Sequence, residues 1–132
     1  MKKIFLLFLL PLILFSNVVF AEGMQPTHVS ELLMIHHPSC HYCKAFMREV
    51  VPTYNQTKQG KALPLHIMDV SNPENLAWVK EQMKLRNIKG IRGTPTFIII
   101  SNGKEVGRVV GYAGKDWFFE RLDEAVKRSV QQ

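Results

Sequence analysis

The run LLMIHHPSCHYC, residues 32–43, contains both cysteines of this 132-residue chain, Cys40 and Cys43. The apolar residues before them predict a buried strand over Glu31–His36, and the spacing after them predicts a helix over Lys44–Tyr54. A thiol pair therefore lies at a strand-to-helix junction. A reversible disulfide exchanger needs this arrangement, because it places one sulfur at the open end of a helix.

The rest of the chain shows the same kinds of pattern. We expect the first helix to end or bend at Pro52, followed by a loop over Asn55–Lys61 and a strand over Leu63–Asp69. A second helix should run from an Asn72 cap to about Leu85, with Leu76, Val79 and Met83 on its buried face. A strand over Thr96–Ser101, a turn at Asn102-Gly103, a strand over Glu105–Val110 and a last helix capped by Asp116 complete the chain. The order βαβαββα predicts an α/β fold with a mixed four-stranded sheet flanked by helices.

The first residues have the pattern of a secretory signal. A basic start and a twelve-residue apolar run, followed by a segment ending in Ala21, predict a signal peptide over residues 1–21. The run is shorter than the roughly 20 residues needed to cross a bilayer. Cleavage would leave a loosely ordered lead-in over 22–30 and one domain over 31–132. Because apolar residues continue to Phe20, an uncut anchor is the alternative. The sequence thus predicts a periplasmic protein, held at the membrane if the leader stays.

The charge pattern argues against nucleic-acid binding. Without the two leader lysines, fifteen Lys and Arg stand against eleven Asp and Glu, a net charge of +4. These residues are dispersed and often adjacent to residues of opposite sign, which is typical of a solvated surface. The 111 residues after the leader leave no room for a dimerisation module, so we expect a monomer.

Two other uses of the cysteines stay open. A structural disulfide between Cys40 and Cys43 would close a very short loop and contribute on the order of 2 kcal/mol at most. A zinc or copper carrier could use both thiolates with His36, His37 or His41. The redox interpretation requires no cofactor. It also explains the position of the pair better than a structural disulfide does.

The redox interpretation has a mechanism. Cys40 lies just ahead of the helix, where unpaired N–H groups and the positive end of the helix dipole favour the thiolate. His41 and Lys44 can add positive charge nearby. Cys43 lies one helical turn further on and is expected to be shielded. Cys40 is therefore predicted to attack a partner's disulfide, and Cys43 to resolve the mixed disulfide.

With its Cys-x-x-Cys turn, its later Gly93-Thr94-Pro95-Thr96-Phe97 and its element order, the chain resembles the thioredoxin-fold family. The resemblance implies that Pro95 is cis and packs beside the attacking cysteine, and that the backbone of Thr94 faces the substrate. His41 and Tyr42, between the two cysteines, are then the expected partner contacts.

Within that family the chain is most similar to the small exported thioredoxin-like proteins of bacterial sulfur-oxidation operons. The shared segments are Cys40-His41-Tyr42-Cys43-Lys44, Thr94-Pro95-Thr96-Phe97, Gly103-Lys104-Glu105-Val106-Gly107-Arg108 and Gly111-Tyr112. This likeness implies a reductase that keeps the cysteine of a partner, such as a sulfur-carrier protein, reduced with electrons from a membrane thiol donor. A stabilised Cys40 thiolate would also suit a periplasmic disulfide oxidase or isomerase, so these remain alternatives.

The chain departs from cytosolic thioredoxins at three positions. Ser39 stands where they have tryptophan, while Met34 and Leu65 stand where they bury an aspartate and a lysine. The resemblance therefore implies that the usual proton-accepting carboxylate near Cys43 is missing here. The sequence does not reveal which group replaces it.

Overall fold

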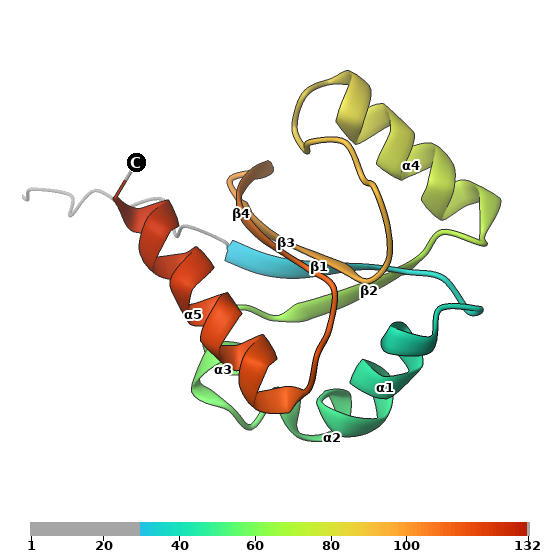
Figure 1. The fold of residues 1–132 in the computed structure, drawn as a ribbon. Helices are drawn as coiled ribbons and strands as arrows, with labels where there is room; N and C mark the ends of the chain where they lie inside the picture. The colour runs from blue at the N-terminus through green and yellow to red at the C-terminus, as the bar shows by residue number, and fades with distance from the viewer. Residues whose placement is uncertain (1–29, 132) are drawn as a thin grey trace, which may run out of the picture.

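The computed structural model describes residues 30–131. Its elements are β1 Ser30–His36, α1 His41–Glu49, α2 Val51–Tyr54, α3 Lys58–Ala62, β2 Leu65–Asp69, α4 Pro73–Lys84, β3 Thr96–Ser101, β4 Lys104–Val110 and α5 Lys115–Val130 (Figure 1). The predicted signal peptide and all of the lead-in except Ser30 lie outside the described residues. None of the helices within 30–131 has the length and apolar content to cross a membrane.

The strands form one mixed sheet in the order β2-β1-β3-β4. β1 and β2 are parallel, whereas β3 is antiparallel to both β1 and β4. The predicted parallel crossover and antiparallel hairpin are therefore confirmed. Ile35 lies opposite Thr96, so the end of β1 and the start of β3 meet at the same end of the sheet. This register brings the segment after β1 close to the segment before β3.

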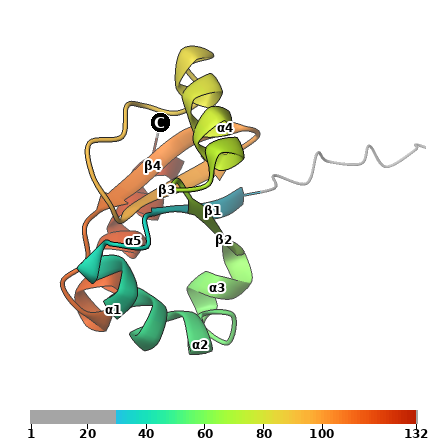
Figure 2. The same cartoon turned by 90° about the vertical axis from the view of Figure 1, so that its right-hand side faces the viewer.

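Helices cover both faces of the sheet. α1, α3 and α5 lie on one side and α4 lies on the other (Figures 1 and 2). A buried cluster lies on each face of the sheet, and alternate residues of β1 belong to one or the other. Leu32 and Met34 pack with α1 and α5, while Leu33 and Ile35 pack under α4. This alternation follows from the two-residue period of a strand, and it makes β1 buried on both faces.

Aromatic rings fill the core between α1 and the sheet. The ring of Phe46 lies 4.6 Å from that of Phe97, 4.8 Å from that of Phe118 and 5.5 Å from that of Tyr112, measured between centroids. Tilted and edge-on pairs of this kind are the favourable ones. Because Phe46 lies one turn beyond Cys43, this ring cluster anchors the helix that carries the two cysteines.

The loop predicted over Asn55–Lys61 was wrong, because a short helix, α3, occupies most of it. Thr57 begins this helix, and its Oγ1 accepts a hydrogen bond of 2.9 Å from the N–H of Gly60. The Gly60 backbone lies so close to the Tyr54 carbonyl that a Cβ there would overlap it. Gly60 therefore permits close packing rather than marking a loop. Pro52 behaves as predicted, since the first helix ends before it and α2 follows.

Two details of the later helices also differ from prediction. Leu76 is 37% exposed, because α4 packs on the sheet through its second half, by Val79 and Met83. Asp116 lies inside the first turn of α5 rather than at its cap, which is Gly114. The φ of Gly114 is +111°, a conformation that favours glycine. Asp116 still faces the positive end of the helix dipole.

Candidate redox-active site

Cys40 and Cys43 form a disulfide at the amino end of α1, with their Cα atoms 5.2 Å apart. Cys40 is the residue that caps the helix, and its Sγ accepts a hydrogen bond of 3.1 Å from the N–H of Cys43. Cys43 is fully buried, whereas Cys40 is only partly buried. A partner can therefore approach the first sulfur more easily than the second.

The turn before α1 holds Cys40 in this position. The N–H of Cys40 donates to the carbonyl of His37 at 3.0 Å, and the Nδ1 atom of His37 lies 2.7 Å from the Ser39 hydroxyl. No acidic residue occupies the first turn of α1. The positive helix end therefore acts on the Cys40 sulfur without an opposing carboxylate in that turn.

Thr94 and Pro95 lie at the same end of the sheet as the disulfide. Their peptide bond is cis, as the resemblance implied, and Pro95 is fully buried. The carbonyl of Pro95 accepts a hydrogen bond of 2.8 Å from Gly111, and the Thr96 hydroxyl donates to the carbonyl of Gly93 at 2.7 Å. Thr94 itself is partly exposed. The structure thus brings these two predicted residues to the end where the cysteines lie.

His41 and Tyr42 project to the surface from the first turn of α1. Tyr42 is 59% exposed, which is unusual for a large aromatic side chain, and its ring meets that of His41 edge-on at 5.7 Å. Both residues follow Cys40 directly. They are therefore placed to contact a chain that approaches that sulfur.

The interior behind Cys43 is apolar. Cys43 belongs to a buried cluster that includes Met34, Phe46, Phe97 and Tyr112. Met34 is fully buried at the position where the resemblance implied a missing carboxylate. The hydroxyl of Tyr112 in this cluster donates a hydrogen bond to Glu49 at 2.6 Å. Burial, and to a smaller extent this hydrogen bond, raises the pKa of the Tyr112 phenol well above its ordinary value.

Glu105 and Arg108 form a clamp that sequence reasoning missed. Glu105 binds both the guanidinium of Arg108, at 2.6 and 2.7 Å, and the N–H of Lys89 at 2.8 Å. Arg108 also donates to the carbonyls of Gly90 and Lys89, at 3.0 and 3.2 Å. The clamp ties the segment that leads to Thr94 onto β4. The Lys89 N–H is 16 residues from Glu105 and the Gly90 carbonyl is 18 residues from Arg108, so no local pattern in the sequence marks these contacts.

Removing the guanidinium of this clamp is expected to destabilise the fold. Arg108→Ala leaves the Glu105 side chain, which is 3% exposed, without its cation, so we expect a loss of about 2–3 kcal/mol in the free energy of unfolding. Denaturant titration measures it, with Lys104→Ala at an exposed position of the same strand as the control. A loss equal to that of the control would contradict the role assigned to the clamp.

The same clamp predicts how stability depends on pH. Burial raises the pKa of Glu105, but the hydrogen bonds from Arg108 and Lys89 outweigh it and hold the pKa below the ordinary value. A lowered pKa means that this stabilisation is present at neutral pH and lost as the pH falls through the acid range.

The structure gives the metal-carrier alternative no ligand set. Within residues 30–131, no group of three or more His, Cys, Asp or Glu side chains is arranged to hold a metal ion. The Nδ1 atom of His37 is already bound within its own turn, and His41 is exposed beside Tyr42.

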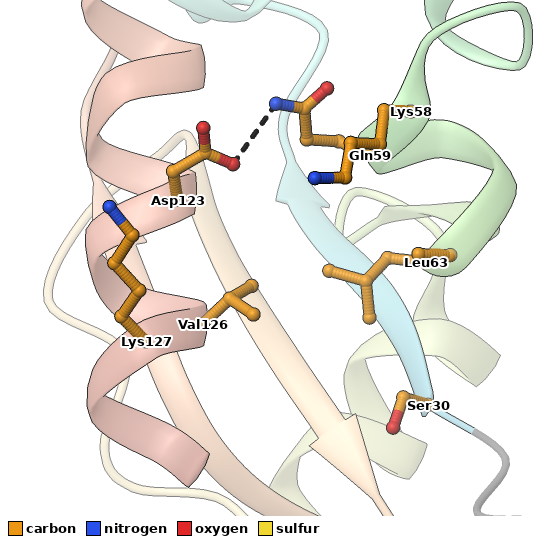
Figure 3. A pocket seen from close by; sticks show the side chains of 8 residues that line it. Ser30, Lys58, Gln59, Leu63, Asp123, Val126 and Lys127 are labelled. Atoms are coloured by element: carbon orange, nitrogen blue, oxygen red, sulfur yellow. Dashed lines mark hydrogen bonds between the residues drawn. The ribbon is translucent and has the colours of Figure 1, made fainter. Parts of the chain in front are cut away.

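A cavity of about 540 Å³ lies away from the disulfide, between α3 and α5 (Figure 3). Leu63 and Val126 face one another across it, and Ser30 marks its lower end. Ser30 begins β1 and the cysteines follow the end of that strand. The length of β1, roughly 20 Å of extended chain, therefore separates the Ser30 end of the cavity from the cysteines. The cavity therefore plays no part in the chemistry of the cysteines.

Comparison with known proteins relates the chain to one family. Residues 23–126 match the family described as thioredoxin-like domain. No curated protein matches the chain. The periplasmic thioredoxin SoxS of Paracoccus pantotrophus, in its reduced form, is 26% identical with a TM-score of 0.62, and the match covers 76% of this chain and 99% of that chain.

Two further structures have the same fold. Thioredoxin f from spinach chloroplast is 27% identical with a TM-score of 0.53, over 77% of each chain. The carboxyl-terminal domain of DsbD from Neisseria meningitidis, in its oxidised form, is 23% identical with a TM-score of 0.51, over 73% of this chain and 79% of that chain. At that lower identity, the likeness to the DsbD domain concerns the fold.

Proposed function

Because the chain belongs to the thioredoxin-like family and is a thiol-disulfide oxidoreductase, we propose that it works outside the cytoplasm as a reductase of a partner protein. The partner would carry a disulfide or an oxidised cysteine, and the Cys40/Cys43 dithiol would supply the electrons. The observation that carries the exchange chemistry is the unequal exposure of the two sulfurs at the amino end of α1, and the likeness to a periplasmic thioredoxin supports the reducing direction and the location.

The proposed reaction has two steps. The Cys40 thiolate attacks one sulfur of the partner's disulfide, a Cys40–partner disulfide forms, and the other partner sulfur leaves as a thiolate that takes up a proton. The Cys43 sulfur, after losing its proton, then attacks Cys40 and releases the second partner thiol. The partner gains two electrons, and the chain is left with the Cys40–Cys43 disulfide that the structure contains.

The residues around the disulfide would receive the partner. The backbone of Thr94 would pair with an extended segment of the partner, while His41 and Tyr42 would contact it from α1. The partly exposed Thr94 and the strongly exposed Tyr42 support these roles. We expect no nucleic acid among the partners and a monomeric protein.

The position of Cys40 at the helix end also bears on the source of electrons. The amino end of a helix stabilises a thiolate. This favours the reduced dithiol over the disulfide and makes the dithiol a weaker reductant. A reductase with this site therefore needs a dedicated donor that keeps it reduced, and we propose a thiol donor in the membrane. The apolar leader pattern and the likeness to a periplasmic thioredoxin support the location. A sulfur-carrier protein is the partner that the narrower likeness suggests.

A Cys43→Ser variant is expected to accumulate as a mixed disulfide with its partner, because the resolving sulfur is gone while Cys40 can still attack. The variant is incubated with an extracytoplasmic extract, and thiol-sensitive adducts are identified by mass spectrometry. The double variant Cys40→Ser/Cys43→Ser is the control and should capture nothing. If the single variant formed no adduct through Cys40, the exchange mechanism would be wrong.

The direction of electron flow has its own measurement. Rapid acid quenching and alkylation of cells report how much of the Cys40/Cys43 pair is reduced in place. A reductase supplied by a donor should be found mainly as the dithiol. A pair found mainly as the disulfide would instead indicate an oxidase.

A further inference from the structure

His36, the last residue of β1, has a ring nitrogen that the reaction above does not use. Its Nδ1 atom is buried and has no hydrogen-bond partner within residues 30–131. Buried polar atoms in native proteins are nearly always bonded, so an exception calls for an explanation. A buried nitrogen close to a site of proton transfer can be kept free to exchange a proton.

The strand alternation places His36 on the face that carries the cysteines. Leu32 and Met34 point into the cluster that contains Cys43, whereas Leu33 and Ile35 point to the α4 side. His36 follows Met34 by two residues and therefore shares its face. It is also one step nearer to α1, the helix that Cys40 and Cys43 begin. The carbonyl of His36 accepts a hydrogen bond of 2.9 Å from Val70, which fixes this end of the strand.

The carboxylate of Asp69 lies on the strand next to His36. His36 lies opposite Asp69 in the parallel pairing of β1 with β2, so the two side chains share a face. Hydrogen bonds from Ser71 lower the pKa of Asp69, with smaller effects of the nearby imidazoles of His36 and His37. The ionised Asp69 would stabilise a positive imidazolium at His36.

Other ionisable groups lie near His36 along the chain. His37 follows it in the turn after β1, and the two thiols of the reduced protein lie at the amino end of α1, where His41 and Lys44 also lie. The segment 93–95, which precedes the neighbouring strand, carries no ionisable side chain, and Arg92 comes directly before it. Asp69 is therefore the carboxylate that the sheet presents to His36, and the thiols are the proton donors on that side.

We propose that His36, supported by Asp69, accepts the proton of the Cys43 thiol and so replaces the carboxylate whose place Met34 fills. This inference rests on the proposed function. In the resolving step the S–H bond of Cys43 breaks and its proton passes to the imidazole. The Cys43–Cys40 bond then forms, the Cys40–partner bond breaks, and the departing thiolate takes up the proton. Imidazole suits this task because it exchanges protons close to neutral pH.

The test isolates the resolving step. The reduced protein reacts with 5,5′-dithiobis(2-nitrobenzoate), which forms a mixed disulfide at Cys40, and release of the second nitrothiobenzoate reports the attack by Cys43. The release rate is followed by stopped flow from pH 5 to pH 9. In His36→Gln the rate is expected to be about tenfold lower at pH 6 and to approach the wild-type rate at pH 9, where the thiol ionises without help.

The matched control is His66→Gln, which removes an exposed imidazole of β2 and should keep the wild-type profile. A His36→Gln profile equal to the wild type, or slowed by the same factor at every pH, would overturn the proposal, since the second result indicates a purely structural role. If the wild-type protein itself released no second nitrothiobenzoate, both the proposed function and this inference would be wrong. If the wild-type protein released it and only the His36→Gln profile failed to change as expected, this inference alone would be wrong.

A second measurement needs no variant. In the wild-type protein, an NMR titration follows the ring signals of His36 in the oxidised and reduced states. We expect the midpoint of the His36 titration to differ between the two states, because reduction replaces the neutral disulfide with two ionisable thiols. Identical midpoints would overturn the proposal even if His36→Gln failed to fold.

Discussion

Cys40→Ser is expected to abolish disulfide reduction, lowering kcat/KM for reduction of insulin disulfides by about 10⁴-fold or more. Cys40 is the accessible sulfur of the pair, and Cys43, at 0% exposure, cannot take over the attack on a protein partner. Turbidity of the released insulin chain, with dithiothreitol as the electron source, measures the rate. The rate without enzyme sets the lower limit of the measurement.

Serine is a suitable replacement because it preserves the start of α1. Cys40 caps that helix through its sulfur, and a serine hydroxyl is among the preferred caps. Thermal unfolding of Cys40→Ser should therefore resemble that of the reduced wild-type protein. Retention of more than about one tenth of the wild-type activity would show that the chemistry does not begin at Cys40.

Phe46→Ala is expected to have the largest effect on stability, a loss of about 3–5 kcal/mol in the free energy of unfolding. Phe46 is fully buried, and its ring contacts those of Phe97, Phe118 and Tyr112. Removing it leaves a cavity where α1 and α5 meet the sheet, and rigid neighbouring rings can collapse into that space only in part. Urea denaturation of the oxidised protein provides the measurement.

The control for this substitution is Val130→Ala. Val130 is 81% exposed at the end of α5, so its truncation should change stability by less than about 0.5 kcal/mol. Because Phe46 also anchors α1, the reduced Phe46→Ala variant should expose Cys43 to alkylation faster than the wild type does. A loss of stability below about 1 kcal/mol would contradict the anchoring role of the ring cluster.

The elements that the sequence predicted well are those with strong local patterns. The apolar run before Cys40, the helical spacing after it and the Asn102-Gly103 turn each depend on residues close together in the chain. The φ angles at that turn, +52° and +74°, are those that Asn and Gly accept most readily. The positions of Cys40 and Cys43 followed from motif spacing in the same way, since Cys40 caps the helix that contains Cys43, whereas the roles expected of Thr94 and Pro95 came from the family resemblance.

The errors arose where contacts from elsewhere decide the local structure. A polar stretch around Gly60 looks like a loop until the Tyr54 backbone packs against it. The cap of α5 is Gly114 rather than Asp116, because the chain must turn sharply after β4 to bring Phe118 into the core.

From its sequence, this protein was predictable as a Cys-x-x-Cys exchanger with a βαβαββα order, because helical and strand periodicity and capping residues act over a few positions. Only the tertiary structure placed Asp69 opposite His36 and closed Glu105 and Arg108 onto Lys89 and Gly90. Such partners are selected by strand register and by packing across the sheet. Those interactions join residues distant in the chain, so no local pattern in the sequence specifies them.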